Sequence, residues 1–74
     1  MRVRHKENSP LRNMRMARTI KQEDLARLVG VTQETISRAE RGLQLPRSDV
    51  QIRIAAVLGA SVDDLFPARE AVAS

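Results

Sequence analysis

With 74 residues, no cysteine and one histidine, the chain has room for one domain with a modest core and lacks the residues for a disulfide framework or a zinc site. Thirteen Lys and Arg residues against nine Asp and Glu give a formal charge of +4, which favours a polyanionic partner without identifying one. The aliphatic residues far outnumber the single aromatic one, and no apolar run approaches the roughly 18 residues of a membrane span, so we expect an all-α, cytoplasmic domain without a membrane partner.

The expected domain occupies residues 9–66, between two ends that lack helical periodicity. Residues 1–8 are polar and basic, and we interpret them as a flexible arm. Residues 67–74 follow the last helical pattern and form a C-terminal tail without an assigned structure. The sequence contains no internal repeat or low-complexity stretch, so we expect one structural unit.

The first two helices are predicted from their caps and from apolar spacing. Ser9 followed by Pro10 is a helix-start signal, because the Ser oxygen accepts hydrogen bonds from free amides and Pro suits the first helical position. Apolar residues spaced three and four apart predict helices over 10–18 and 22–29. Gly30 is expected to end the second helix, because glycine readily adopts the positive φ that is common just past a helix.

The third and fourth helices have similar signals. Thr32 is a good N-cap for a third helix over 33–41, which is closed by a glycine. The fourth helix is expected to start at Arg47 or Ser48 and to end at Gly59.

A short fifth helix is predicted where Ser61 and Asp64 form a capping arrangement, and it should end before Pro67. The apolar residues of helices two to four that should face the core are Leu25, Ala26, Val29, Ile36, Ala39, Val50, Ile54, Ala55 and Leu58.

The segment 22–41, QEDLARLVGVTQETISRAER, is the most informative part of the chain. Two short helices joined by a tight turn cross at a wide angle only where the crossing point is small, the turn permits positive φ and apolar groups fill the angle. Ala26, Gly30 and Val31 meet these demands in that order. The spacing therefore predicts a helix-turn-helix.

This segment and its surroundings resemble the Xre/Cro family of phage-repressor-like helix-turn-helix domains. The chain has KQEDLA, LVGVT and TISRAERG where the family has TQEELA, LGVS and TIS-R-E-RG, and it continues with LPRSDVQIRIAAVLGASVDDLF. The resemblance covers residues 11–66 without an obvious gap. It implies a compact five-helix, lambda-repressor-like DNA-binding domain with a central helix-turn-helix.

The chain departs from the family pattern at several positions. Lys21 stands where a Ser or Thr usually caps the second helix, and Thr19 with Gln22 three residues later is expected to form a capping box instead, which would start this helix early. Gln51 replaces a commonly apolar residue and Ala39 a bulkier one, so we expect local repacking of the core near the fourth helix.

The resemblance implies that the third helix enters the DNA major groove and that Gln33, Glu34 and Arg38 read base edges. A Gln amide pairs with adenine through two hydrogen bonds, Arg pairs with guanine in the same way, and a carboxylate accepts from the cytosine amino group. Thr32 and Thr35 would contact DNA at the start of this helix. The alternative is that these residues are simply exposed, and for Glu34 the two interpretations are balanced because phosphates repel a carboxylate.

Other positions are expected to bind DNA phosphates or to support the fold. The resemblance implies that Gln22 binds a phosphate at the start of the second helix. Lys21, Arg41 and Arg47 would add contacts that do not depend on sequence, unless they are merely solvated charges.

The resemblance also implies that Arg15 and Glu40 form a structural ion pair between the first and third helices. Asp63 and Asp64 are interpreted as partners of a helix dipole rather than as a catalytic or metal-binding pair. Because no nucleophile with a base, no phosphate-binding glycine loop and no ligand cluster occurs in the sequence, we expect a non-enzyme without a cofactor or a metal.

We therefore expect a transcriptional regulator, with repression favoured, that occupies an operator and belongs to the nucleoid-associated fraction of the cytoplasm. One domain contacts few bases, so a homodimer on a palindromic operator is expected. Leu43, Leu45 and Val72 are the candidate dimer contacts. The alternatives are an antitoxin whose main partner is a protein and whose DNA binding is autoregulatory, and a restriction-modification controller.

Overall fold

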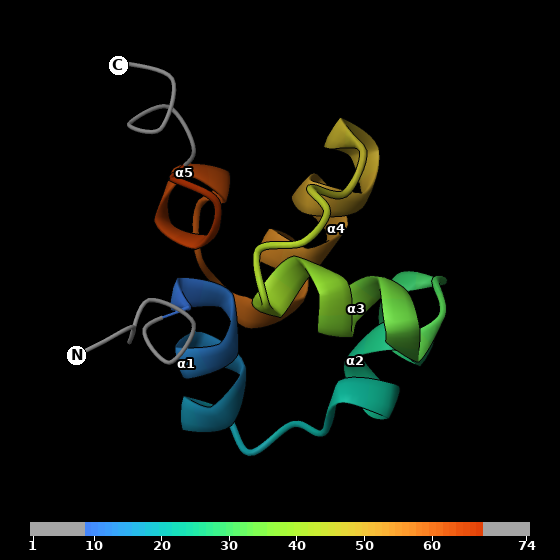
Figure 1. The fold of residues 1–74 in the computed structure, drawn as a ribbon. Coiled ribbons are helices and arrows are strands. Elements are labelled where there is room, and N and C mark those ends of the chain that lie inside the picture. Colours follow the sequence, from blue (N-terminus) through green and yellow to red (C-terminus); the bar gives the residue numbers. More distant parts are fainter. Residues whose placement is uncertain (1–8, 68–74) are drawn as a thin grey trace, which may run out of the picture.

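The computed structural model describes residues 9–67, and within this range every regular element is an α-helix (Figure 1). The helices are α1 (Pro10–Ala17), α2 (Gln22–Val29), α3 (Gln33–Glu40), α4 (Ser48–Leu58) and α5 (Val62–Leu65). The predicted all-α class and the five-helix order are thus confirmed. The interpretations of residues 1–8 and of 68–74 lie outside the described residues.

Side-chain caps start three of the helices at the predicted positions. The Ser9 hydroxyl accepts a hydrogen bond from the Arg12 amide at 3.2 Å, and the Thr32 hydroxyl caps α3 in the same way. Ser61 and Asp64 form a complete capping box at α5. These bonds satisfy amides that a helix leaves without an internal partner, so local sequence sets where these helices begin.

Helix α2 differs from the prediction at its start. The expected capping box of Thr19 and Gln22 is wrong, because α2 begins at Gln22 and its N-cap is Lys21, which makes no side-chain cap. Thr19 has a left-handed backbone (φ 59°), and its amide bonds to the Met16 carbonyl. Thr19 is therefore part of the turn that closes α1 and is not the N-cap of α2.

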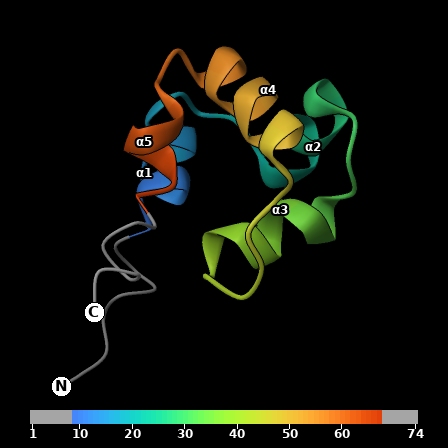
Figure 2. The ribbon, with the colours of Figure 1, turned by 90° about the horizontal axis from the view of Figure 1, so that it is seen from above.

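The helices surround one hydrophobic core. Helix α5 packs against α1 and α4, α2 packs against α4 and α3, and α3 packs against α1, which closes a ring of contacts. Figure 2 shows this arrangement from above. The buried apolar residues are Leu11, Leu25, Ala26, Val29, Ile36, Val50, Ile54, Ala55, Leu58, Leu65 and Phe66. All the predicted inward residues are among them except Ala39, which is partly buried against the core. Residues of both α2 and α3 belong to this core, which therefore holds the two helices in a fixed relative position.

The polar residue Gln51 in α4 supports the loop that follows α3. Its side chain is half-buried, and its Nε2 donates to the carbonyl oxygen of the buried Pro46 at 2.7 Å. A buried polar group costs little when it is hydrogen-bonded in this way. Gln51 thus anchors the 41–47 loop where an apolar residue would leave the carbonyl without this donor.

Candidate nucleic-acid interface

The turn between α2 and α3 is tight and well bonded. Gly30 has φ 89°, and the amides of Gly30 and Val31 both donate to the Ala26 carbonyl, at 2.8 and 2.9 Å. Val31 is partly buried against the core, and Thr32 then returns the backbone to an extended conformation as the cap of α3. The small residue, the left-handed residue and the apolar residue thus occupy the positions that the crossing of two helices requires.

Helix α3 has one buried face and one exposed face. Ile36 and Glu40 are buried, whereas the predicted base-reading residues Gln33, Glu34 and Arg38 are all exposed. Gln33 and Glu34 lie in the first turn of α3, and Arg38 lies about one turn further along the helix. The exposed face therefore offers both hydrogen-bond donors and acceptors to a partner.

The two threonines at the start of α3 contact each other. Thr32 is exposed and Thr35 is half-buried, and their Oγ1 atoms are 3.0 Å apart. Since Thr32 also caps the Thr35 amide at 3.2 Å, the first turn of α3 is fixed before any partner binds.

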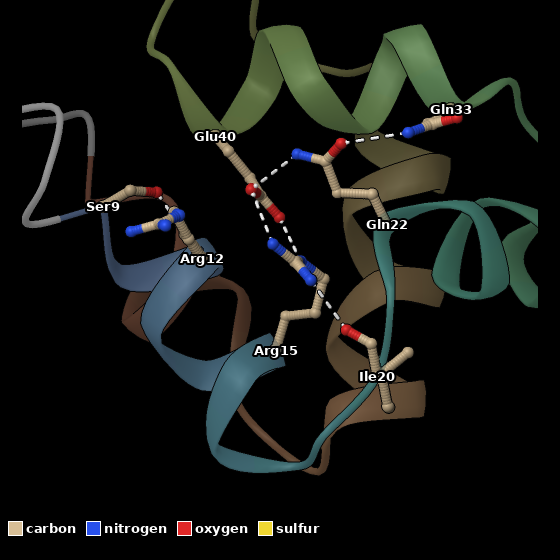
Figure 3. A network of polar contacts seen from close by, with 7 residues as sticks. All are labelled: Ser9, Arg12, Arg15, Ile20, Gln22, Gln33 and Glu40. Atoms are coloured by element: carbon tan, nitrogen blue, oxygen red, sulfur yellow. Dashed lines mark hydrogen bonds and ion pairs between the residues drawn. The ribbon is translucent and has the colours of Figure 1, made fainter.

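The predicted ion pair lies between α1 and α3 (Figure 3). Arg15 Nε donates to Glu40 Oε2 at 2.5 Å, and Arg15 Nη2 donates to Glu40 Oε1 at 3.1 Å. Arg15 Nη1 also donates to the Ile20 carbonyl at 2.7 Å. Because the side chains are only 10% and 2% exposed, this pair holds α1, α3 and the α1–α2 connection together in a largely dry environment.

A line of hydrogen bonds extends from this ion pair to the exposed face of α3. Gln22 Nε2 donates to Glu40 Oε1 at 3.0 Å, and Gln33 Nε2 donates to Gln22 Oε1 at 3.3 Å. Figure 3 shows the Gln22 side chain between the other two. The Gln22 amide group, which sequence analysis assigned to a phosphate, is thus engaged within the protein and bridges the buried ion pair and Gln33.

Two of the predicted base-reading residues contact each other. Arg38 Nη2 donates to Glu34 Oε2 at 2.7 Å, one helical turn earlier, and Arg38 Nη1 donates to Gln44 Oε1 at 3.4 Å. Sequence analysis missed Gln44, because it lies in the irregular 41–47 loop, where no periodicity indicates which side chain approaches α3.

The predicted phosphate-binding cations lie apart from one another along the chain. Lys21 precedes α2, Arg41 follows α3, and Arg47 precedes α4; all three are exposed. Arg47 Nε lies 3.3 Å from Asp49 Oδ1, so its charge is partly balanced by a neighbour.

A pocket of about 260 Å³ lies beside the start of α3. Its lining residues are Val31, Thr35, Gln44, Leu45, Pro46, Arg47 and Val50. Of the candidate dimer contacts, Leu45 lines this pocket and is 58% exposed, and Leu43 is 65% exposed. Val72 lies outside the described residues.

Residues 9–67 were also compared with the requirements of a metal site and of a membrane span by what their side chains and helices offer. In this part of the chain, no three His, Cys, Asp or Glu side chains gather in a way that would hold a metal ion. No helix in the same range is long and apolar enough to cross a membrane.

The fold, the tight turn and the exposed face of α3 together define a helix-turn-helix domain. Residues 11–65 match the helix-turn-helix family model, and the chain belongs to that family. The resemblance to the Xre/Cro helix-turn-helix domains is thereby confirmed.

Two archaeal proteins are similar to this chain over most of their length. An uncharacterized HTH-type transcriptional regulator from Methanocaldococcus jannaschii is 34% identical over 56 residues, which are 76% of this chain and 85% of that protein. An uncharacterized HTH-type transcriptional regulator from Archaeoglobus fulgidus is 39% identical over 56 residues, which are 76% of this chain and 80% of that protein. No solved structure matches the chain significantly.

Proposed function

We propose that this protein is a transcriptional regulator that binds double-stranded DNA in a sequence-specific way and reads the major groove with α3. The observation that carries the proposal is the two-sided character of α3, whose rear is held by Ile36 and Glu40 while Gln33, Glu34 and Arg38 are exposed on its front. The similarity to two proteins named as transcriptional regulators supports it.

The proposed base contacts follow from the chemistry of the side chains. Gln33 suits adenine, Arg38 suits guanine, and Glu34 has the acceptor that the cytosine amino group requires. Thr32 and Thr35 contact DNA at the start of α3, where the free amides and the helix dipole favour a phosphate.

The other contacts supply affinity without sequence preference. Lys21, Arg41 and Arg47 bind phosphates on the strands that flank α3, and Gln22 binds a phosphate at the start of α2. The net charge of +4 steers the protein toward DNA.

The proposed mode of action is repression by a homodimer on a palindromic operator, in the nucleoid-associated fraction of the cytoplasm. Two copies read two half-sites about one helical turn apart, which supplies specificity that one short helix lacks. Leu43 and Leu45 are exposed apolar residues on the 41–47 loop and form the proposed contact between copies.

The test is to titrate a selected operator and a scrambled duplex at several salt concentrations. Gln33→Ala should weaken operator binding by about 1–3 kcal/mol and change scrambled-duplex binding less, because it removes a base contact without changing the charge. Lys21→Ala should weaken both duplexes similarly and lower the salt slope by about one unit, because one fewer phosphate is neutralised. Equal losses on both duplexes for Gln33→Ala would contradict base recognition by α3.

A protein-interaction module is the second candidate, and the exposed Leu43 and Leu45, of which Leu45 lines the pocket, favour it. An antitoxin whose main partner is a protein and whose DNA binding is autoregulatory is the example of such a module. A restriction-modification controller is a third candidate, which would use the same DNA contacts as the proposed regulator. A chain that binds no duplex but captures the protein encoded by a neighbouring gene would support the interaction module.

A further inference from the structure

Arg38 is held on two sides by acceptors from different segments of the chain. Glu34 Oε2 accepts from Nη2 at 2.7 Å, and Gln44 Oε1 accepts from Nη1 at 3.4 Å. Glu34 belongs to α3, whereas Gln44 belongs to the loop after it. The guanidinium is thus oriented by a helix residue and a loop residue together.

The orientation brings Arg38 toward the end of α3 that is proposed to enter the groove. Glu34 lies one turn closer to the N-terminus of α3 than Arg38, so the contact draws the guanidinium in that direction. Gln44 lines the same pocket as Thr35, which belongs to the first turn of α3. Glu34 therefore lies in the first turn of α3, and Gln44 lines a pocket that reaches this turn.

The two contacts leave the guanidinium able to bind a base. It has five N–H donors in a fixed plane, and the contacts with Glu34 and Gln44 use two of the five, which leaves three. Guanine presents two acceptors, O6 and N7, on its major-groove edge, and Arg addresses both at once. The remaining donors are thus sufficient for one guanine.

Pairing with Arg38 also explains how the Glu34 carboxylate can lie on the side of α3 that is proposed to face DNA. An unpaired Glu34 would be repelled by DNA phosphates, but the ion pair is neutral as a whole. In the free protein the side chains of Arg38 and Glu34 are 47% and 66% exposed, so water weakens their attraction. When DNA displaces this water, the attraction strengthens and the orientation of Arg38 is fixed.

We propose that Glu34, Arg38 and Gln44 act as one unit that selects a G·C base pair in each half-site. Arg38 makes the guanine contact, and Glu34 Oε2 and Gln44 Oε1 position the plane of its guanidinium. The other carboxylate oxygen of Glu34, Oε1, is then the acceptor for the cytosine amino group of the same base pair. The inference rests on the proposed function, because it requires that α3 lies in the major groove.

The experiment replaces individual guanines of the selected operator by 7-deazaguanine, which lacks the N7 acceptor. One guanine in each half-site should be sensitive, with a loss of roughly ten-fold or more in the affinity of the wild-type protein. Arg38→Ala should bind more weakly and should no longer distinguish the two bases. The measured quantity is the ratio of the affinity for the guanine operator to the affinity for the 7-deazaguanine operator. Glu34→Ala should keep only part of this ratio, and Gln44→Ala should lose less of it. Glu34→Gln should retain more of the ratio than Glu34→Ala, because its amide oxygen still accepts a hydrogen bond.

The matched control is Asp24→Ala, which breaks another exposed helix ion pair, that between Asp24 and Arg27 of α2. This variant should leave the 7-deazaguanine ratio unchanged. Circular dichroism should show wild-type helicity for all of these surface variants, so a changed ratio reports on recognition.

Two results would overturn the inference while the proposed function stands. In one, the operator is preferred to a scrambled duplex, but no guanine is sensitive to 7-deaza substitution. In the other, Glu34→Ala tightens both duplexes equally and leaves the ratio intact, which would make Glu34 only a repulsive charge. A protein without preference between operator and scrambled duplex would contradict the proposed function itself.

Discussion

Arg15 of α1 and Glu40 of α3 are 25 positions apart in the sequence, yet they form a two-point ion pair in which the Glu40 side chain is only 2% exposed. Glu40 ends the helix that begins with Gln33, so the pair fixes the rear of the proposed reading helix to the rest of the fold. The stability of the fold and the proposed DNA recognition therefore both depend on α3.

Replacement of Glu40 by Ala should destabilise the protein strongly. The substitution leaves the Arg15 guanidinium buried without its counter-ion, which costs about 3–5 kcal/mol for a buried pair. In a domain of this size such a loss lowers Tm by more than about 10 °C. Thermal unfolding followed by circular dichroism measures it.

Glu34→Ala is the matched control for this measurement, because Glu34 also pairs with an arginine but is 66% exposed. Its cost should be under about 1 kcal/mol. If the Tm of Glu40→Ala equalled that of the parent protein, the ion pair would contribute no net stability.

The features that the sequence predicted correctly are mostly local. Ser9, Thr32 and the Ser61–Asp64 pair cap helices because a cap depends on residues three positions apart. The wrong prediction at Thr19 is instructive, since its spacing to Gln22 fits a capping box but the turn after α1 places it in a left-handed conformation. The local bonds that close α1, from the Thr19 amide to the Met16 carbonyl and from the Ile20 amide to the Arg15 carbonyl, override the capping signal.

The contacts between segments were less accessible to sequence analysis. The Arg15–Glu40 pair was expected only through the family resemblance, and the hydrogen bond from Gln33 to Gln22 spans two helices without any periodic signal. Gln44 was missed because the path of a loop depends on the elements that it joins. In physical terms, pairing across segments depends on how the helices pack, which single-sequence patterns do not specify.

Gly30 should be hard to replace because of its backbone rather than its surroundings. No atom lies within 4 Å of the position that a Cβ would take, but φ is 89°. Gly30→Ala should therefore cost about 1–2 kcal/mol through left-handed strain alone. Gly30→Asn should cost less, because Asn tolerates this region better. Urea unfolding of both variants checks the order, and equal stability of Gly30→Ala and the parent would contradict it.

The proposed homodimer should weaken when the exposed leucines of the 41–47 loop become polar. Replacing Leu43 and Leu45 by Ser removes apolar area that a second copy would cover, so the sedimentation-derived dimer fraction should fall and binding to a palindromic operator should become less cooperative. Leu28→Ser is the control, because Leu28 in α2 is similarly exposed at 63%. A wild-type protein that is monomeric both free and on a palindromic operator would rule out the dimer.

Gln22 and Gln33 should contribute to operator binding as a coupled pair. Gln33 Nε2 uses one of its two hydrogens for Gln22 Oε1, so the other hydrogen and the Gln33 Oε1 remain for the N7 and N6 groups of adenine. Gln22 in turn is held by Glu40, so the amide plane of Gln33 is oriented from the buried ion pair outward. Removing Gln22 should misorient Gln33 without removing it.

A double-mutant cycle on the selected operator tests this coupling. Gln33→Ala should cost about 1–3 kcal/mol of binding, Gln22→Ala a part of that, and the double variant little more than Gln33→Ala alone. Scrambled duplex provides the baseline, and its binding should show no comparable coupling energy because Gln33 meets no preferred base there. If the two single effects add within about 0.3 kcal/mol, Gln22 acts independently of Gln33, as a separate phosphate contact does.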